Sequence, residues 1–154
     1  MRSPTPTYSF HKWRNDHGGA IVEFAIVLPL LLVLTFGILE FGILFYDKAV
    51  LTNATREGAR AGIIFKEATS GYLSLSDIED IAEAYCTERL ISFSDTAPAP
   101  VSEATRTGTT TGDKLTVKIT YQFNFLAFSN VIALFGNNFS DILTLESQTV
   151  MLLE

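Results

Sequence analysis

The sequence predicts an α+β protein: a long N-terminal helix apolar enough to cross a membrane, a second and amphipathic helix, and a small antiparallel sheet of three to four strands. Three observations support this fold class. Residues 24–39 form an apolar segment without a charge. Apolar residues recur at helical spacing around residues 78–89, and residues 115–125 alternate between apolar and polar side chains, which is typical of a half-buried strand.

The apolar segment predicts a single membrane-spanning helix. Residues 25–46 make up 22 residues, about 33 Å as a helix, which is enough to cross a hydrocarbon core of about 30 Å. Trp13 before the segment and Phe45 and Tyr46 at its end fit an aromatic boundary. A buried helix of a soluble protein would need much more surrounding chain, and a secretory signal peptide would have a shorter apolar core. We therefore expect an anchor.

The charges around the span indicate its orientation. Arg2, Lys12 and Arg14 stand against Asp16 in the first 18 residues, which favours a cytoplasmic N terminus. After Tyr46 there are fourteen acidic residues against eight Lys or Arg, and the whole chain has a net charge of −6. Because the basic residues form no dense cluster, we expect no nucleic-acid partner.

Two acids and a proline lie along the predicted span. Glu23 and Glu40 are 17 residues apart, about 26 Å along a helix, so both can lie near opposite membrane faces. We expect Glu40 to extend its carboxylate to the outer interface. Pro29 removes the hydrogen bond to the carbonyl of Ala25 and predicts a simple kink, with a conformational change on membrane extraction as the alternative.

The helical pattern continues to about Lys66. Ala54, Gly58 and Gly62 recur at every fourth position, so they form a stripe on which another element can approach closely. Packing of this stripe against the sheet of the same domain is the first expectation. Packing against the stem of another subunit is the alternative.

A second helix is predicted at residues 77–93. Ser76 and Glu79 match a capping box, and the apolar residues that follow have helical spacing. Its acids are expected to form a solvated face rather than a cation site; they are Glu79, Asp80, Glu83 and Glu88. The Pro-rich residues 97–100 predict a rigid linker.

The sheet is predicted from the alternating segments. Residues 115–125 form the clearest strand, a Thr-rich turn with Gly108 and Gly112 joins it to a weaker strand at 101–105, and a third strand covers 142–152. Between the strands at 115–125 and 142–152 lie a helical or loop segment at 131–135 and a turn at 136–138. A sheet packed on the helical stem follows.

Residues suited to catalysis are scarce. Cys86 is the only cysteine, and the two histidines, His11 and His17, lie before the span. A buried and inert Cys86 is expected, with intermolecular pairing as the alternative. We find no phosphate loop, metal quartet or nucleophile elbow, so we expect no enzymatic activity, no cofactor and no metal.

The segment before the span resembles a prepilin processing site. In the run from His17 to Phe24, a cut between Gly18 and Gly19 would make Glu23 the fifth residue of the mature chain, and glycine lets a peptidase approach the backbone closely. Residues 18–62 are similar to TadE-like pseudopilins of tight-adherence pilus systems. The motifs that carry the resemblance are Val22-Glu23-Phe24-Ala25, Leu28-Pro29, Glu40-Phe41-Gly42, Asn53-Ala54-Thr55-Arg56-Glu57-Gly58-Ala59-Arg60 and, near the end, Gln148-Thr149-Val150-Met151.

The resemblance implies a pilin-like fold and a division into a cytoplasmic prepilin leader at 1–18, a transmembrane helix at 19–46 and a stem continued into an extracytoplasmic domain at 47–154. It assigns Gly18 and Gly19 to a prepilin peptidase. It assigns Glu23, beside Phe24, to pairing with the new N-terminal amine of a neighbouring subunit during assembly.

The implied role is that of a minor pilin or pseudopilin in the bacterial inner membrane. Its expected partners are the peptidase, other pilins or pseudopilins, the pilus assembly platform and the lipid bilayer. The alternative is a single-pass anchored scaffold or binding protein that never enters a filament.

Overall fold

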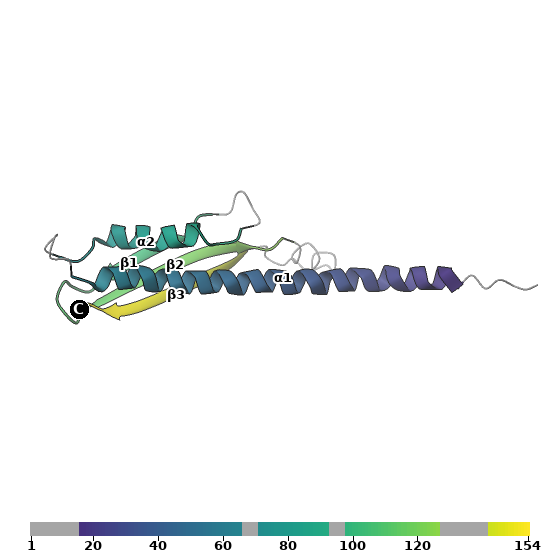
Figure 1. Cartoon of the computed structure of the whole chain (residues 1–154), viewed down its shortest axis with the longest axis horizontal. Helices are drawn as coiled ribbons and strands as arrows, with labels where there is room; N and C mark the ends of the chain where they lie inside the picture. Colours follow the sequence, from purple (N-terminus) through teal and green to yellow (C-terminus); the bar gives the residue numbers. More distant parts are fainter. Residues whose placement is uncertain (1–15, 66–70, 93–97, 127–141) are drawn as a thin grey trace, which may run out of the picture.

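The computed structural model describes residues 16–65, 71–92, 98–126 and 142–154. Its elements are α1 (Asp16–Ile63), α2 (Leu75–Thr87), β1 (Val101–Arg106), β2 (Lys114–Asn124) and β3 (Ile142–Leu152). Figure 1 shows α1 as a long rod whose N-terminal half projects beyond the rest of the molecule, while its C-terminal half lies along the sheet. The predicted α+β fold class is confirmed.

α1 has two halves that differ in burial. The helix is 48 residues long, about 72 Å at 1.5 Å per residue. No residue before position 40 is buried in the described part of the helix, whereas a buried stripe at spacings of three and four follows; it consists of Glu40, Leu44, Asp47, Val50, Leu51, Ala54, Thr55, Gly58, Ala59 and Gly62. Such spacing puts one helix face against the domain. The helix ends three residues before the predicted Lys66, which lies outside the described residues.

The sheet is antiparallel, with β2 between β1 and β3. In the register, Val117 lies opposite Ala104 on one side and Thr149 on the other. Alternate residues of β2 are buried, so the predicted period of two is confirmed and one face of the sheet packs on the helices. The turn between β1 and β2 contains Gly112 at φ +93°, a conformation that favours glycine.

The bounds of α2 differ from the prediction at both ends. Its N-cap is Ser74 rather than Ser76, because Ser74 has an extended backbone and its Oγ accepts the amide of Asp77 at 3.1 Å. The helix ends at Thr87, where the amides of Arg89 and Leu90 both turn back to the carbonyl of Cys86, at 3.0 and 2.8 Å.

The acids in and just after α2 do not all form the solvated face that the sequence predicted. Glu79 accepts the amide of Ala104 at 2.8 Å, and Glu83 accepts the amide and hydroxyl of Ser102 at 3.0 and 2.7 Å. These two carboxylates therefore hold the outer edge of β1 and do not belong to a solvated face. Of the four acids, Asp80 and Glu88 are exposed.

Several predictions fall wholly or partly outside the described residues. They are the leader at 1–18 with its basic residues and Trp13, the segment at 131–135, the turn at 136–138 and the first residue of the linker at 97–100. Pro98, Ala99 and Pro100 are in neither a helix nor a strand.

The two glycines of the small-residue stripe lie against α2, and one of them also lies against the sheet. A Cβ added to Gly58 would lie 3.1 Å from the Cβ of Ala82 and 3.2 Å from the carbonyl oxygen of Ile78. A Cβ at Gly62 would lie 2.5 Å from both Ile78 and Leu115. Gly58 therefore admits α2, and Gly62 admits both α2 and the sheet. The predicted packing on the sheet of the same domain is confirmed at Gly62, and α2 is a further neighbour that the sequence did not indicate.

Candidate functional site

The glycine pair lies in the first turn of α1. Gly18 and Gly19 are the third and fourth residues of a helix that begins at Asp16, both are exposed, and a Cβ at either would meet nothing within 4 Å. The first-turn amides have no intrahelical carbonyl to bond, and glycine costs about 1 kcal/mol in a helix relative to alanine. The helix is therefore easier to unwind around the peptide bond between the two glycines than further along α1.

Glu23 and Phe24 follow one turn later on the same exposed segment. Glu23 is exposed, and Phe24 is 62% exposed. Within the part of the chain that the structure describes, Glu23 forms no ion pair. The carboxylate is thus presented on the outer surface of the helix, where a second molecule can reach it.

The segment between Glu23 and Glu40 has the properties of a membrane span. Within residues 18–63 the structure contains a helix that is long and apolar enough to cross a bilayer, and none of its most apolar window is buried inside the molecule. A core helix of a soluble protein would be covered by other elements, and this one is not. α1 continues through Pro29 as one helix (Figure 1). A kink at this residue stays a prediction.

The second acid of the span is not placed as expected. Glu40 is 3% exposed, so its side chain is enclosed by the domain and does not extend freely into the outer interface as the sequence suggested. The physical reason lies in the position of the domain: the buried stripe of α1 begins at this residue, and the side chain is turned into the fold.

Asp47, two turns further on, is a buried acid that sequence reasoning missed. The residue is 0% exposed, its Oδ1 accepts the amide of Ile91 at 3.1 Å, and its Oδ2 has no hydrogen-bond partner among the described residues. Desolvation raises the pKa of this carboxyl, and the hydrogen bond from Ile91 opposes that shift. Burial also raises the pKa of the Tyr121 hydroxyl, and the nearby charge of Asp47 adds to the effect. The seven-residue spacing from Glu40 to Asp47 was the available signal, because both lie in line with Leu44 and Leu51.

Cys86 lies in the core of the domain, as expected. The thiol is free and buried, and desolvation together with the charge of Glu83 raises its pKa to about 11. Since the thiolate is the reactive form, this environment makes the thiol unreactive at neutral pH. Among the described residues no group of three or more His, Cys, Asp or Glu side chains is placed to hold a metal ion.

The fold and the exposed helix together define a class: a small α+β domain built on one long helix whose N-terminal half fits a single-pass membrane anchor. The model of the TadE-like protein family matches residues 18–60. This match begins at the first glycine of the pair, contains Glu23 and Glu40, and ends within α1. The resemblance to TadE-like proteins is thereby confirmed for the helix. No curated protein and no solved structure matches the chain.

Proposed function

We propose that this chain is a minor pilin or pseudopilin that acts in the assembly of a tight-adherence pilus or a related secretion or adhesion apparatus, without enzymatic activity of its own. One observation carries the proposal: the match to the TadE-like family covers the exposed helix and starts at the glycine pair, with Glu23 four residues after Gly19. The resemblance supplies the role, and the geometry of α1 supports it.

Processing would change what Glu23 can bind. A cut between Gly18 and Gly19 produces an α-amine, and α-amines are mostly protonated at neutral pH. An isolated carboxylate costs about 2.5–3.5 kcal/mol at the bilayer centre and less toward the interface, and a docked ammonium group relieves that cost. The exposed Glu23 of one subunit can therefore receive the new amine of a neighbour, which sets the axial register between helices.

The same proposal predicts the membrane and the orientation in which the chain lies. The basic residues before the span favour a cytoplasmic N terminus in the bacterial inner membrane, with the domain after Tyr46 on the periplasmic or extracytoplasmic side. The glycine pair would then meet a prepilin peptidase at the cytoplasmic face. Other pilins or pseudopilins and the assembly platform would meet the exposed helix in the bilayer.

The first test is a variant of the cleavage site. We expect Gly18→Ala to keep the first eighteen residues attached, because a methyl group hinders close approach of the peptidase to the backbone. Intact-mass analysis of the membrane-extracted chain measures this. Gly37→Ala is the matched control, since a Cβ at Gly37 also meets nothing within 4 Å, and it should mature normally. Normal maturation of Gly18→Ala would contradict the proposed cut. A leader retained on the working wild-type form would favour the anchored scaffold.

The second test removes the charge of Glu23. We expect Glu23→Leu to insert and be cut but to lose co-purification with its pilin partners by more than tenfold, because removing one member of a buried ion pair costs about 3–5 kcal/mol. Glu57→Leu, an equal change at an exposed acid of the stem, is the control and should leave co-purification unchanged. Partners recovered in full with the Glu23 variant would rule out pairing with the amine.

A further inference from the structure

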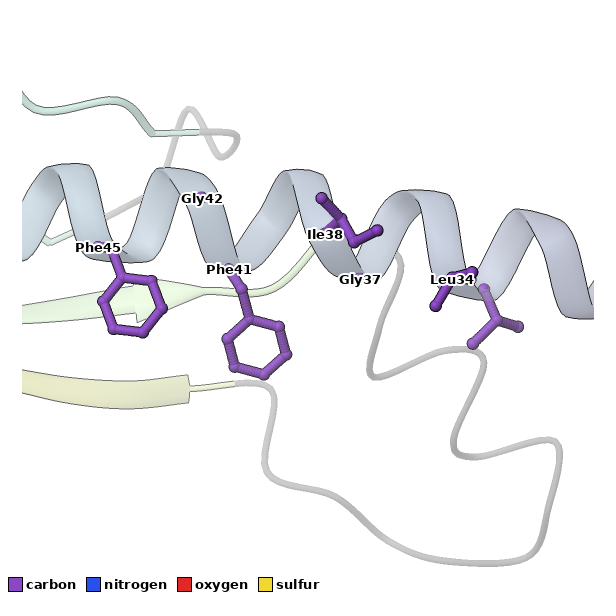
Figure 2. Close-up of a pocket in the computed structure, with 7 residues that line it drawn as sticks. Leu34, Gly37, Ile38, Phe41, Gly42 and Phe45 are labelled. Atoms are coloured by element: carbon purple, nitrogen blue, oxygen red, sulfur yellow. The ribbon is translucent and has the colours of Figure 1, made fainter.

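One end of the sheet meets α1 where the exposed half of the helix ends. The ladder between β2 and β3 ends with the pair Asn124 and Ile142. Just beyond it, the ring of Phe125 packs edge-to-face on Phe41, with 6.3 Å between the ring centroids. Phe41 follows Glu40, the first buried residue of the α1 stripe. Figure 2 shows the ends of both strands beside this turn of the helix.

This end of the domain carries apolar side chains that remain exposed. We call them the apolar rim: Phe41 (41% exposed), Phe45 (68%), Leu126 (51%), Ile142 (50%) and Leu143 (40%). Leu143 is two residues before the buried Leu145, so both side chains point to the core face of β3. Leu143 nevertheless remains two-fifths exposed. Between Phe41 and Phe45, α1 has no charged residue, and the neighbouring carboxylates of Glu40 and Asp47 are both buried.

The rim is continuous with the apolar surface of the span. A groove of about 580 Å³ lies along α1 next to the rim. It is lined by Val33, Leu34, Gly37, Ile38, Phe41, Gly42 and Phe45. Figure 2 shows the side chains of Leu34, Ile38, Phe41 and Phe45 on this part of the helix. Among the described residues, the lining consists of apolar side chains and glycine alone. Two of its residues, Phe41 and Phe45, also belong to the rim, so no polar belt formed by described residues separates the groove from the domain.

We infer that the apolar rim is a second membrane-contact surface and that its partner is the lipid leaflet on the domain side of the bilayer. The inference rests on the membrane anchor of the proposed function. Residues 19–39, the part of α1 before its first buried residue, are about 31 Å long as a helix, which fills a hydrocarbon core of about 30 Å. Because Glu40 is buried in the domain, the span ends at this turn and not at Tyr46, where the sequence placed its end. The boundary of that core then falls at Phe41, so the rim lies at the edge of the hydrocarbon, where Phe and Leu side chains can bury among the acyl chains. Acyl chains fill the groove, and the domain rests on the membrane instead of standing clear of it.

A matched pair of positions on one strand tests the inference. Ile142 and Leu152 lie at opposite ends of β3, point to the same face and are 50% and 56% exposed, and they are about 33 Å apart along the strand. Nitroxide labels are attached to Ile142→Cys and Leu152→Cys in the full chain, in a Cys86→Ala background, and the protein is placed in vesicles of phosphatidylethanolamine and phosphatidylglycerol. Accessibility to oxygen, which concentrates in lipid, is compared with accessibility to a water-soluble nickel chelate.

We expect the oxygen-to-nickel accessibility ratio to be several-fold higher at position 142 than at position 152. Equal ratios at the two positions would overturn the inference, because the rim would then be in water. A label at 142 that neither reagent reaches would also overturn it, since a second protein would cover the rim. A label at Leu34→Cys distinguishes failure of the rim inference from failure of the membrane anchor. Oxygen-favoured access there shows that the anchor is in the bilayer whatever position 142 reports, while nickel-favoured access there means that the helix does not span the membrane.

Discussion

At the scale of single residues, burial decides what each acid of α1 does. Glu23 and Glu40 are chemically identical, but Glu23 is exposed on the helix surface and Glu40 is 3% exposed. Asp47 is enclosed completely, with one carboxylate oxygen bonded to the amide of Ile91 and the other without a hydrogen bond among the described residues. A buried acceptor left unpaired costs about 1–3 kcal/mol, so Asp47 lowers the stability of the domain in its charged form.

The variant Asp47→Asn tests this cost. The folded-state pKa of Asp47 is raised above its ordinary value of 3.8, so the folded chain holds the proton more strongly than the unfolded chain does. The contribution of this group to stability is therefore complete below the unfolded pKa and is lost as pH rises through the folded pKa. We expect Asp47→Asn to raise the free energy of unfolding at neutral pH and to weaken its fall with rising pH. Thermal unfolding of the detergent-solubilised chain, followed by near-UV circular dichroism, measures both effects.

Asp113 provides the opposite case as a control. Hydrogen bonds from the hydroxyl and the amide of Thr110 lower the pKa of this exposed carboxyl. Its contribution to stability is therefore present above the unfolded pKa and is lost as pH falls through the folded pKa. Asp113→Asn should lower stability at neutral pH. If the two variants shift stability in the same direction, burial does not explain the behaviour of Asp47.

At the scale of secondary-structure elements, α2 protects an edge of the sheet. An exposed edge strand presents unpaired amides that can recruit strands of other molecules. In β1 the amides of Ser102 and Ala104 are instead bonded by Glu83 and Glu79 of α2. Helix and strand are thereby joined by polar contacts in addition to their packing, and the edge is closed to further pairing.

We expect Glu79→Ala to expose the amide of Ala104, and Glu83→Ala to expose that of Ser102, each with a loss of about 1–3 kcal/mol, because hydrogen bonds to charged groups are among the stronger ones. Hydrogen exchange resolved at these two amides measures the effect. Asp80→Ala, at an exposed acid of the same helix, should leave both amides protected. Unchanged exchange in the two glutamate variants would show that packing alone closes the edge.

At the scale of the whole molecule, a single helix combines a segment that fits a membrane anchor with the scaffold of the domain. The N-terminal half of α1 is exposed and apolar, and the C-terminal half carries α2 and the sheet (Figure 1). The buried Thr55 joins α1 to β3 through its hydroxyl, 2.9 Å from that of Thr149. At Gly62 all three parts meet, because its missing side chain admits Ile78 of α2 and Leu115 of β2 together.

Gly62→Ala tests that junction. The new methyl group would lie 2.5 Å from Ile78 and from Leu115, and both of those side chains are fully buried. Overpacking costs about 1–3 kcal/mol, while alanine improves helix propensity by about 1 kcal/mol. Because both contacts are far closer than van der Waals distance, we expect the upper part of the resulting range, a net loss of about 1–2 kcal/mol in the free energy of unfolding of the domain. Gly42→Ala, where a Cβ meets nothing within 4 Å, should cause no loss. Equal stability of the two variants would mean that the elements do not approach closely at Gly62.

Much of the fold could be predicted because its signals are local. The length of the apolar run, the period of two in β2 and the bounds of β3 follow from neighbouring residues, and β3 has the predicted bounds of 142–152. The bounds of α2 were harder, because two serines in its first turn compete for the cap, and only the extended backbone of Ser74 lets its hydroxyl accept an amide.

The sequence by itself determined the membrane-length helix, the order of the elements and the segment that resembles TadE-like proteins, because each depends on residues close together in the chain. Only the tertiary structure decided which acids are buried, which of them hold β1, and that Gly58 faces α2. These outcomes depend on pairs such as Asp47 with Ile91 and Glu79 with Ala104. Residues so far apart in sequence meet only when the helices pack on the sheet. Burial strongly changes the free energy of a charged carboxylate, and the sequence around an acid does not reveal whether it is buried.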